Sequence, residues 1–152
     1  MIGSFGGALL GGIVAYKSTV RANNFLLRRK KLEESLGIAT QLEQEDISGA
    51  AAIKICLKAN DIVKNHDVLQ SYSAKINTVN VIRLRTLLQI YHEESYEKAN
   101  NLNTKLIALK VRTRKITSKT SLDEAEGLSA LAMECVILIF EIKKSLMKEL
   151  KI

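Results

Sequence analysis

The chain contains no proline and no tryptophan, and beyond its first sixteen residues it is almost free of glycine. Only three of its eight glycines, at positions 37, 49 and 127, follow Tyr16. Tight turns draw on proline and glycine, so this scarcity excludes most β folds. A length of 152 residues is enough for about one domain with one sizeable core. The sequence therefore predicts an all-α protein.

Cysteine is also scarce. Cys56 and Cys135 lie far apart in sequence, with no second pair to form a disulfide framework or a zinc knuckle. We expect two buried thiols in a reducing cytoplasm. A single disulfide or a reactive thiol is the alternative.

Histidine and carboxylates come together only at His92, which precedes Glu93, Glu94 and Glu97. Glu-x-x-His and His-Glu-x-x-His are ligand spacings typical of metal sites, but Gln89 and Tyr96 stand where each would need a ligand. We expect a solvated polar face here. The sequence also lacks a phosphate-binding loop, a nucleophile elbow and a dinucleotide fingerprint. We therefore predict no catalytic residue, no metal and no cofactor, and a protein that is not an enzyme.

The chain does contain an uncharged, glycine-rich head over residues 1–16. Small residues recur every four positions in two neighbouring rows, and large apolar residues lie opposite them on a helix. Each interior glycine costs a helix about 1 kcal/mol relative to alanine, and close backbone contact between helices in lipid can offset that cost. The predicted membrane and oligomer face, a glycine zipper, consists of Gly3, Gly7, Gly11, Gly12, Ala15, Phe5, Leu9 and Ile13. The alternative is a flexible apolar terminus that packs on the rest of the protein.

The apolar head has a marginal length for a membrane span. Residues 2–16 give about 22 Å of helix against about 30 Å of hydrocarbon, and extension to Val20 gives about 28 Å with Lys17 inside. Lys17 can extend its ammonium to the interface. We expect either a short span or a helix that inserts only as part of an oligomer.

Positive charge is concentrated in two segments of a chain whose net charge is +7. Such segments favour anionic partners, either lipid headgroups or nucleic acid. Few aromatic residues are present and no groove-reading motif is visible, so nucleic acid is the less expected partner. The predicted anionic-lipid contacts are Lys17, Arg21, Arg28, Arg29, Lys30 and Lys31. A secondary basic patch consists of Lys105, Lys110, Arg112, Arg114, Lys115 and Lys119, with a solvated helix face as the alternative.

Hydrophobic spacing divides the chain into helices. We expect one helix over 2–36 that ends at Gly37, a connection over 41–46, and a second helix over 47–65. A third begins near Asp67, and its core seam is expected at Leu69, Tyr72, Ile76, Val79, Ile82, Thr86 and Ile90. The asparagine-rich run 100–103 predicts a break, with one long bent helix over 67–118 as the alternative. An apolar stripe follows at Leu102, Leu106, Leu109 and Ile116. The last helix begins with a capping box at 121–124, and its segment 128–140, apolar almost all round, is expected at the centre of the bundle. The alternative is a second membrane span, which would place Glu134 near the middle of the bilayer.

These elements predict a helical bundle of four to five helices with an apolar, glycine-rich N-terminal helix. We divide the chain into a membrane-interacting helix with a basic flank (1–36) and a helical bundle (37–152). The head Ile2–Tyr16, the basic flank and the apolar helix 128–140 resemble the membrane-perforating bundles of regulated cell death: the fungal HeLo domains, their bacterial Bell relatives and the bundle of the necroptosis pseudokinase. The resemblance implies an N-terminal helix that is held against the bundle at rest and is released on oligomerisation to breach a membrane. Such bundles usually belong to larger proteins with a signalling module, so for a chain that ends at Ile152 we expect a separate activating or regulatory protein.

The functional expectation is a membrane-associated protein, with its bundle in the cytoplasm, that forms homo-oligomers and permeabilises or remodels an anionic membrane. The alternative is a membrane-anchored scaffold or accessory subunit that docks a larger assembly. A nucleic-acid-binding helical protein is the third and least expected function.

Overall fold

The computed structural model describes the backbone of residues 3–58, 62–76, 78–116 and 122–152. Side chains are described for residues 14–51, 53, 68–76, 78–116, 123–124 and 126–152. The elements are α1 (Gly3–Lys58), α2 (Ile62–Lys75), α3 (Thr78–Tyr91), α4 (Glu93–Lys115) and α5 (Leu122–Leu150). Over the described ranges there is no strand, and the predicted all-α bundle of four to five helices is confirmed.

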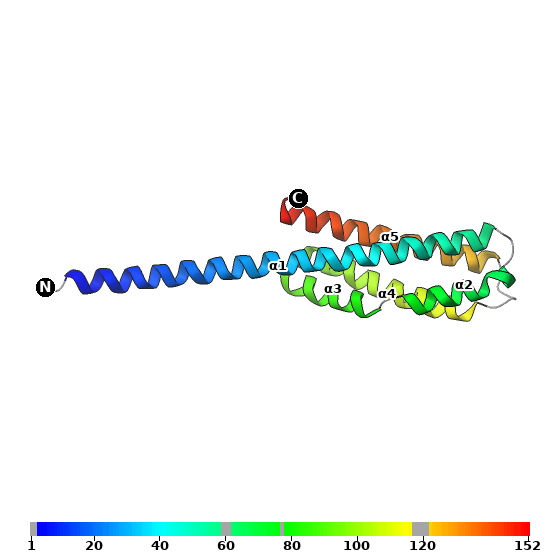
Figure 1. The fold of residues 1–152 in the computed structure, drawn as a ribbon, viewed down its shortest axis with the longest axis horizontal. Coiled ribbons are helices and arrows are strands. Elements are labelled where there is room, and N and C mark those ends of the chain that lie inside the picture. The colour runs from blue at the N-terminus through cyan, green and yellow to red at the C-terminus, as the bar shows by residue number, and fades with distance from the viewer. Residues whose placement is uncertain (1–2, 59–61, 77, 117–121) are drawn as a thin grey trace.

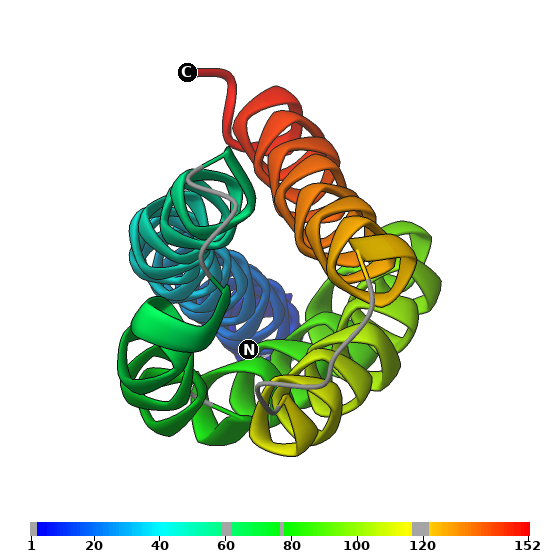
Figure 2. The same cartoon turned by 90° about the vertical axis from the view of Figure 1, so that its right-hand side faces the viewer.

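The helices form an up-down-up-down bundle with four positions (Figure 1). Helices α2 and α3 follow each other in line and together occupy one position, so that α1, the α2–α3 pair, α4 and α5 surround the core (Figure 2). Helix α1 packs against α5 on one side and against α2 and α3 on the other, and α4 closes the ring. Short connections between antiparallel neighbours favour this topology.

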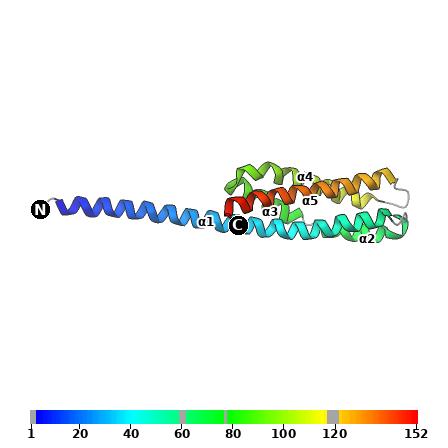
Figure 3. The ribbon, with the colours of Figure 1, turned by 90° about the horizontal axis from the view of Figure 1, so that it is seen from above.

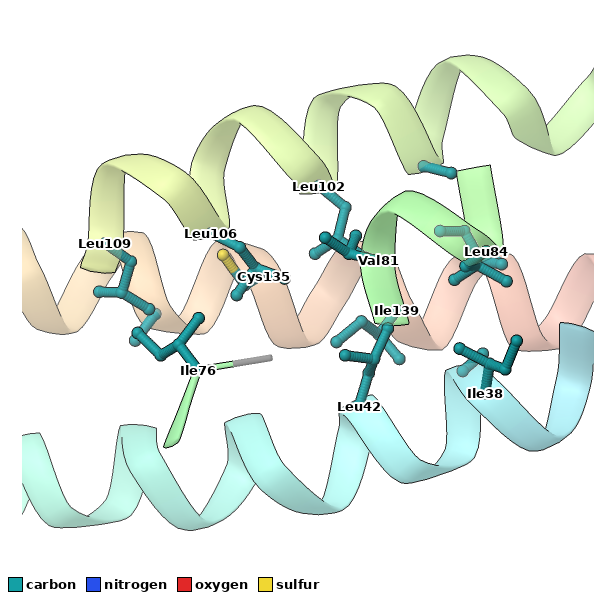
Figure 4. Close-up of a cluster of buried hydrophobic side chains, with 14 of the residues drawn as sticks. Ile38, Leu42, Ile76, Val81, Leu84, Leu102, Leu106, Leu109, Cys135 and Ile139 are labelled. Carbon is teal, nitrogen blue, oxygen red and sulfur yellow. The ribbon is translucent and has the colours of Figure 1, made fainter. Parts of the chain in front are cut away.

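The core follows a heptad pattern, with buried residues at alternating steps of three and four. In α1 the heptad row consists of Leu32, Ser35, Ala39, Leu42, Asp46, Gly49 and Ile53, and Ile38 beside this row is buried as well. In α4 they are Ser95, Ala99, Leu102, Leu106, Leu109 and Thr113, and in α5 Leu128, Ala132, Cys135, Ile139, Ile142, Leu146 and Leu150. Figure 4 shows side chains from these helices and from α3 meeting between the ribbons. The predicted apolar stripe of α4 and the buried thiol at Cys135 are confirmed, whereas the side chain of Cys56 lies outside the described residues.

Helix α1 does not end where the sequence predicted. It continues through Gly37 and through the polar segment 41–46 to Lys58, so the predicted C-cap and the predicted connection are both wrong. Gly37 has no positive φ and no heavy atom near the position of an added Cβ, so it is an ordinary exposed helical residue. Leu42 lies in the core inside the polar segment, and tertiary packing therefore overrides the local composition. The division into 1–36 and 37–152 stays a prediction, and α1 crosses it without a break.

The seam predicted after Asp67 is correct only in its first half. Leu69, Tyr72 and Ile76 are buried as predicted, but Val79, Ile82 and Ile90 are exposed, and so is Thr86. The helix is interrupted between α2 and α3, and this interruption changes the register. Among the described residues, the next buried one after Ile76 is Val81, and Leu84 and Leu88 continue from it. The predicted break at 100–103 does not occur, because α4 runs through this segment with Leu102 in the core.

The apolar composition of α5 predicted a helix at the centre of the bundle, and this prediction is wrong. One face is buried, but Met133, Ile137 and Phe140 are each more than half exposed on the opposite face. A four-position bundle has no central helix, because every helix contacts two neighbours and solvent. Ser121 of the predicted capping box lies outside the described residues.

The first half of α1 extends past the end of the bundle (Figures 1 and 3). We call residues 3–27 the overhang, because Arg28 is the first of the described α1 side chains that bonds to another helix, through Glu149 of α5. At 1.5 Å per residue the overhang is about 38 Å long. The described side chains from Val14 to Lys30 are all exposed.

The register of α3 predicts opposite effects for two neighbouring apolar residues. Leu88 is 0% exposed and Ile90 is 66% exposed. Leu88→Ala leaves a cavity and is expected to lower the free energy of unfolding by about 2–5 kcal/mol. Ile90→Ala is expected to change it by less than about 0.5 kcal/mol. Urea unfolding followed by circular dichroism measures both, and equal losses would contradict this register.

Candidate functional site

The overhang exposes large apolar side chains that no other helix covers. Val14, Tyr16, Phe25 and Leu26 are each more than 60% exposed. These residues lie on different sides of the helix, since positions 25 and 26 differ by about 100°. Large apolar side chains that are exposed together on a surface favour contact with a protein partner or a membrane.

The predicted small-residue face lies on the overhang. The backbone of residues 3–15 is continuous α-helix, so the positions Gly3, Gly7, Gly11 and Ala15 fall along one side of it. Of the predicted face, only the side chain of Ala15 is described, and it is exposed. Gly12, Phe5, Leu9 and Ile13 belong to the same helical segment. The helix that the glycine zipper requires is thus present, at a part of α1 that no bundle helix covers.

The six predicted lipid-contacting cations do not form one uniform group. Arg28 Nη2 lies 2.9 Å from Glu149 Oε1, Arg29 Nε lies 3.1 Å from Glu33 Oε1, and Lys31 Nζ lies 2.8 Å from Glu34 Oε2. These carboxylates neutralise the charges of three cations that directly follow the overhang, where α1 enters the bundle. Among the described residues Lys17, Arg21 and Lys30 make no ion pair, and all three are exposed.

The secondary basic patch is divided in a similar way. Lys105 pairs with Glu134, and the Lys110 ammonium donates to the carbonyl oxygen of Ile76 at 3.0 Å, which caps the end of α2. Arg112, Arg114 and Lys115 are exposed at the end of α4. One surface cavity is lined by Arg112 and Lys115 of α4 and by Asp123 and Glu124 at the start of α5. Acidic groups therefore face part of the patch. Lys119 lies outside the described residues.

His92 is not on a solvated face, so this expectation is wrong. It lies at the junction between α3 and α4, is buried, and its Nδ1 has no hydrogen-bond partner in the described structure. The turn between the two helices folds the imidazole inward, while Glu93, Glu94 and Glu97 are exposed as predicted. Within the part of the chain that the structure describes, no three His, Cys, Asp or Glu side chains come together to hold a metal ion.

A buried polar cluster between α1 and α2 was not predicted. Asp46 occupies a heptad position of α1 and faces Tyr72 of α2, and both line a cavity between the two helices. Asp46 Oδ2 and the Tyr72 hydroxyl have no hydrogen-bond partner in the described structure. The sequence signal that could have revealed this cluster is the spacing of Asp46, four residues after Leu42 and seven before Ile53. This spacing places a carboxylate in an apolar row.

Burial changes the acid-base chemistry of this cluster. Desolvation, and secondly the nearby charge of Glu45, raises the pKa of Asp46 to about 7. Desolvation together with the Asp46 carboxylate raises the pKa of the Tyr72 hydroxyl above its ordinary value. The same two causes raise the pKa of the Cys135 thiol to about 12, so this thiol is an unreactive core group at neutral pH.

Comparison of the chain with known protein families, curated proteins and solved structures finds no match. Across the described ranges, none of the helices combines the length and the apolar character that a membrane crossing requires.

The raised pKa of Asp46 predicts a pH-dependent stability. The folded state holds a proton on Asp46 up to about pH 7, whereas an unfolded aspartate loses it near pH 4. The unfolding free energy should therefore fall as the pH rises from about 4 to 8, by up to about 4 kcal/mol from this group. Asp46→Asn should remove this part of the pH dependence and stabilise the protein at pH 8.

Urea unfolding at pH 5 and pH 8 measures the effect, with Asp123→Asn, an exposed carboxylate on α5, as the matched control. The same loss between the two pH values in wild type and Asp46→Asn would contradict a buried Asp46.

Proposed function

We propose that this protein associates with anionic membranes through the overhang, self-associates there through its small-residue face, and permeabilises or remodels the bilayer, while the bundle remains on the cytoplasmic side. The observation that carries the proposal is the exposure of Val14, Tyr16, Phe25 and Leu26 on a part of α1 that no other described helix covers. Their burial in lipid or between copies stabilises the assembly by about 25 cal/mol per Å² of apolar surface.

The charges support the same orientation. Among the residues whose side chains are described, Lys17, Arg21 and Lys30 are exposed cations without a carboxylate partner. Lys17 and Arg21 lie on the overhang after the apolar head, and Lys30 lies where α1 enters the bundle. Each lysine or arginine near an anionic leaflet contributes about 1 kcal/mol of attraction. The attraction places the bundle side of the overhang at the headgroups and directs the glycine-rich end inward.

Self-association follows from the composition of residues 3–15. An isolated glycine-rich helix is unstable in water. In lipid, the hydrophobic effect supplies little free energy for its association with other helices. Packing of small faces against each other supplies van der Waals contact between backbones. We therefore place the helix in the membrane as part of an oligomer, which is consistent with its marginal length and apolar character.

The test is dye release from phosphatidylglycerol and phosphatidylcholine vesicles by the full chain and by the double variant Gly7→Leu/Gly11→Leu. Leucine favours helix and partitions into lipid better than glycine, so the variant keeps the helix and the membrane binding but closes the small face. We expect dye release to fall at least tenfold, and cross-linked oligomers to disappear, while co-sedimentation with vesicles persists.

Gly37→Leu is the matched control, because it lies on the same helix and an added Cβ there contacts no other atom. Its dye release should equal that of wild type. Unchanged release by the double variant would contradict packing through the small face.

An anchored scaffold is the second candidate. An apolar surface groove of about 510 Å³ lies between α1 and α5, with Ile47, Ala51 and Met133 among its walls, and Ile137 and Phe140 extend the apolar surface along α5. Exposed apolar surface of this kind favours a protein partner. A scaffold would bind vesicles without releasing dye, and the double variant would behave as wild type in both assays.

A further inference from the structure

A cavity of about 620 Å³ lies between α1 and α2, away from the overhang. Glu45 and Asp46 line it from α1, and Val68, Tyr72, Lys75 and Ile76 line it from α2 and its C-terminal end. Val68 and Lys75 are exposed at its rim, whereas Asp46, Tyr72 and Ile76 are buried at its inner wall. The cavity therefore connects solvent to a buried polar floor. Its volume falls within the range of small-molecule sites.

The floor of this cavity carries polar atoms that the protein itself does not satisfy. Asp46 is 4% exposed and Tyr72 is 7% exposed. Asp46 Oδ2, Glu45 Oε2 and the Tyr72 hydroxyl have no hydrogen-bond partner in the described structure. A buried polar group without a partner costs about 1–3 kcal/mol, so a ligand that satisfies several of them gains that energy on binding.

Gly49 fixes the position of the Tyr72 ring. A Cβ added at Gly49 would lie 1.7 Å from Tyr72 Cε2 and 1.9 Å from Cζ, so no other residue fits with the ring in this place. The absence of a side chain at position 49 lets the ring lie directly against the backbone of α1. The phenol oxygen is thereby held on the same side of α1 as the Asp46 carboxylate, one helical turn earlier.

We propose that this cavity binds an organic monoamine with a short apolar body. The ammonium group donates hydrogen bonds to the Asp46 carboxylate and the Tyr72 oxygen, and the body of the ligand packs against Val68 and Ile76. This binding site goes beyond the proposed membrane function and does not depend on it.

The lining selects this class over other ligands. Two carboxylates disfavour an anion, and the described residues offer no third ligand that would complete a metal site. Lys75 on the rim is exposed and repels a second positive charge, so a polyamine should bind less well than a monoamine. The apolar residues Val68 and Ile76 favour a hydrocarbon body over a bare ammonium ion.

Titration of the full chain with phenethylamine, by calorimetry at pH 8, tests the proposal. We expect saturable binding, at least tenfold weaker binding of the neutral analogue 2-phenylethanol, and at least tenfold weaker binding of phenethylamine to Asp46→Asn. Tyr72→Phe removes only the phenol oxygen and should weaken binding severalfold. Asp123→Asn removes an exposed carboxylate at the start of α5 that does not line this cavity, and this variant should bind as wild type.

Circular dichroism verifies that Asp46→Asn is folded, and the removal of an uncompensated buried carboxyl favours this outcome. Gly49→Ala displaces the Tyr72 ring and gives a second, independent loss of binding. Absence of phenethylamine binding at millimolar concentration, or equal binding of the alcohol, would overturn the proposal. So would equal binding by folded Asp46→Asn.

Discussion

Packing of the heptad row of α1, from Leu32 to Ile53, against α5 on one side and α2 and α3 on the other is the interaction on which the rest of the structure depends. Ion pairs from Arg83 of α3 to Glu34, and from Lys143 of α5 to Glu43, reinforce the two contacts at the surface. Helix α1 contains no proline and runs without a break from Gly3 to Lys58. The part of α1 that packs in the bundle therefore sets the direction of the overhang. The overhang is therefore presented as one helix at the end of the bundle.

This arrangement separates two kinds of surface on one helix. Residues 32–53 bury one stripe and expose the other, as a bundle helix does, whereas the described overhang residues expose apolar side chains on several sides. The two parts join at Arg28–Lys31, where ion pairs with Glu149, Glu33 and Glu34 neutralise three of four consecutive cations. Lys17 and Arg21, which have no ion-pair partner among the described residues, lie farther out on the overhang.

Much of the fold could be predicted from the absence of proline and the spacing of leucines. The stripe of α4 and the buried residues before Ile76 followed directly from periodicity. The continuity of α1 could not be predicted, because Ser35, Asp46 and Gly49 occupy heptad positions and hide the apolar row. The register of α3 could not be predicted either, because the interruption after Ile76 changes which face is buried, and nothing local in the sequence announces it.

The candidate site shows the same division. The glycine spacing of the overhang was visible in the sequence, but the exposure of Phe25 and Leu26 was not predicted. The pairing of Lys105 with Glu134 depends on how α4 packs against α5. Asp46 and Tyr72 were each visible, but only the bundle brings them to one cavity. Side chains that serve the packing of the bundle, such as Lys110 of α4 that caps the end of α2, cannot be told from a lipid-binding group by composition alone.

The most direct measurement of the central claim uses the lack of tryptophan in the chain. Tyr16→Trp on the overhang and Val79→Trp on the bundle each introduce a single reporter at positions that are both 72% exposed. On addition of phosphatidylglycerol vesicles, the emission of Trp at position 16 should shift to the blue and lose its quenching by iodide, while the reporter at position 79 should stay unchanged. Equal responses at the two positions, or none at position 16, would contradict the account.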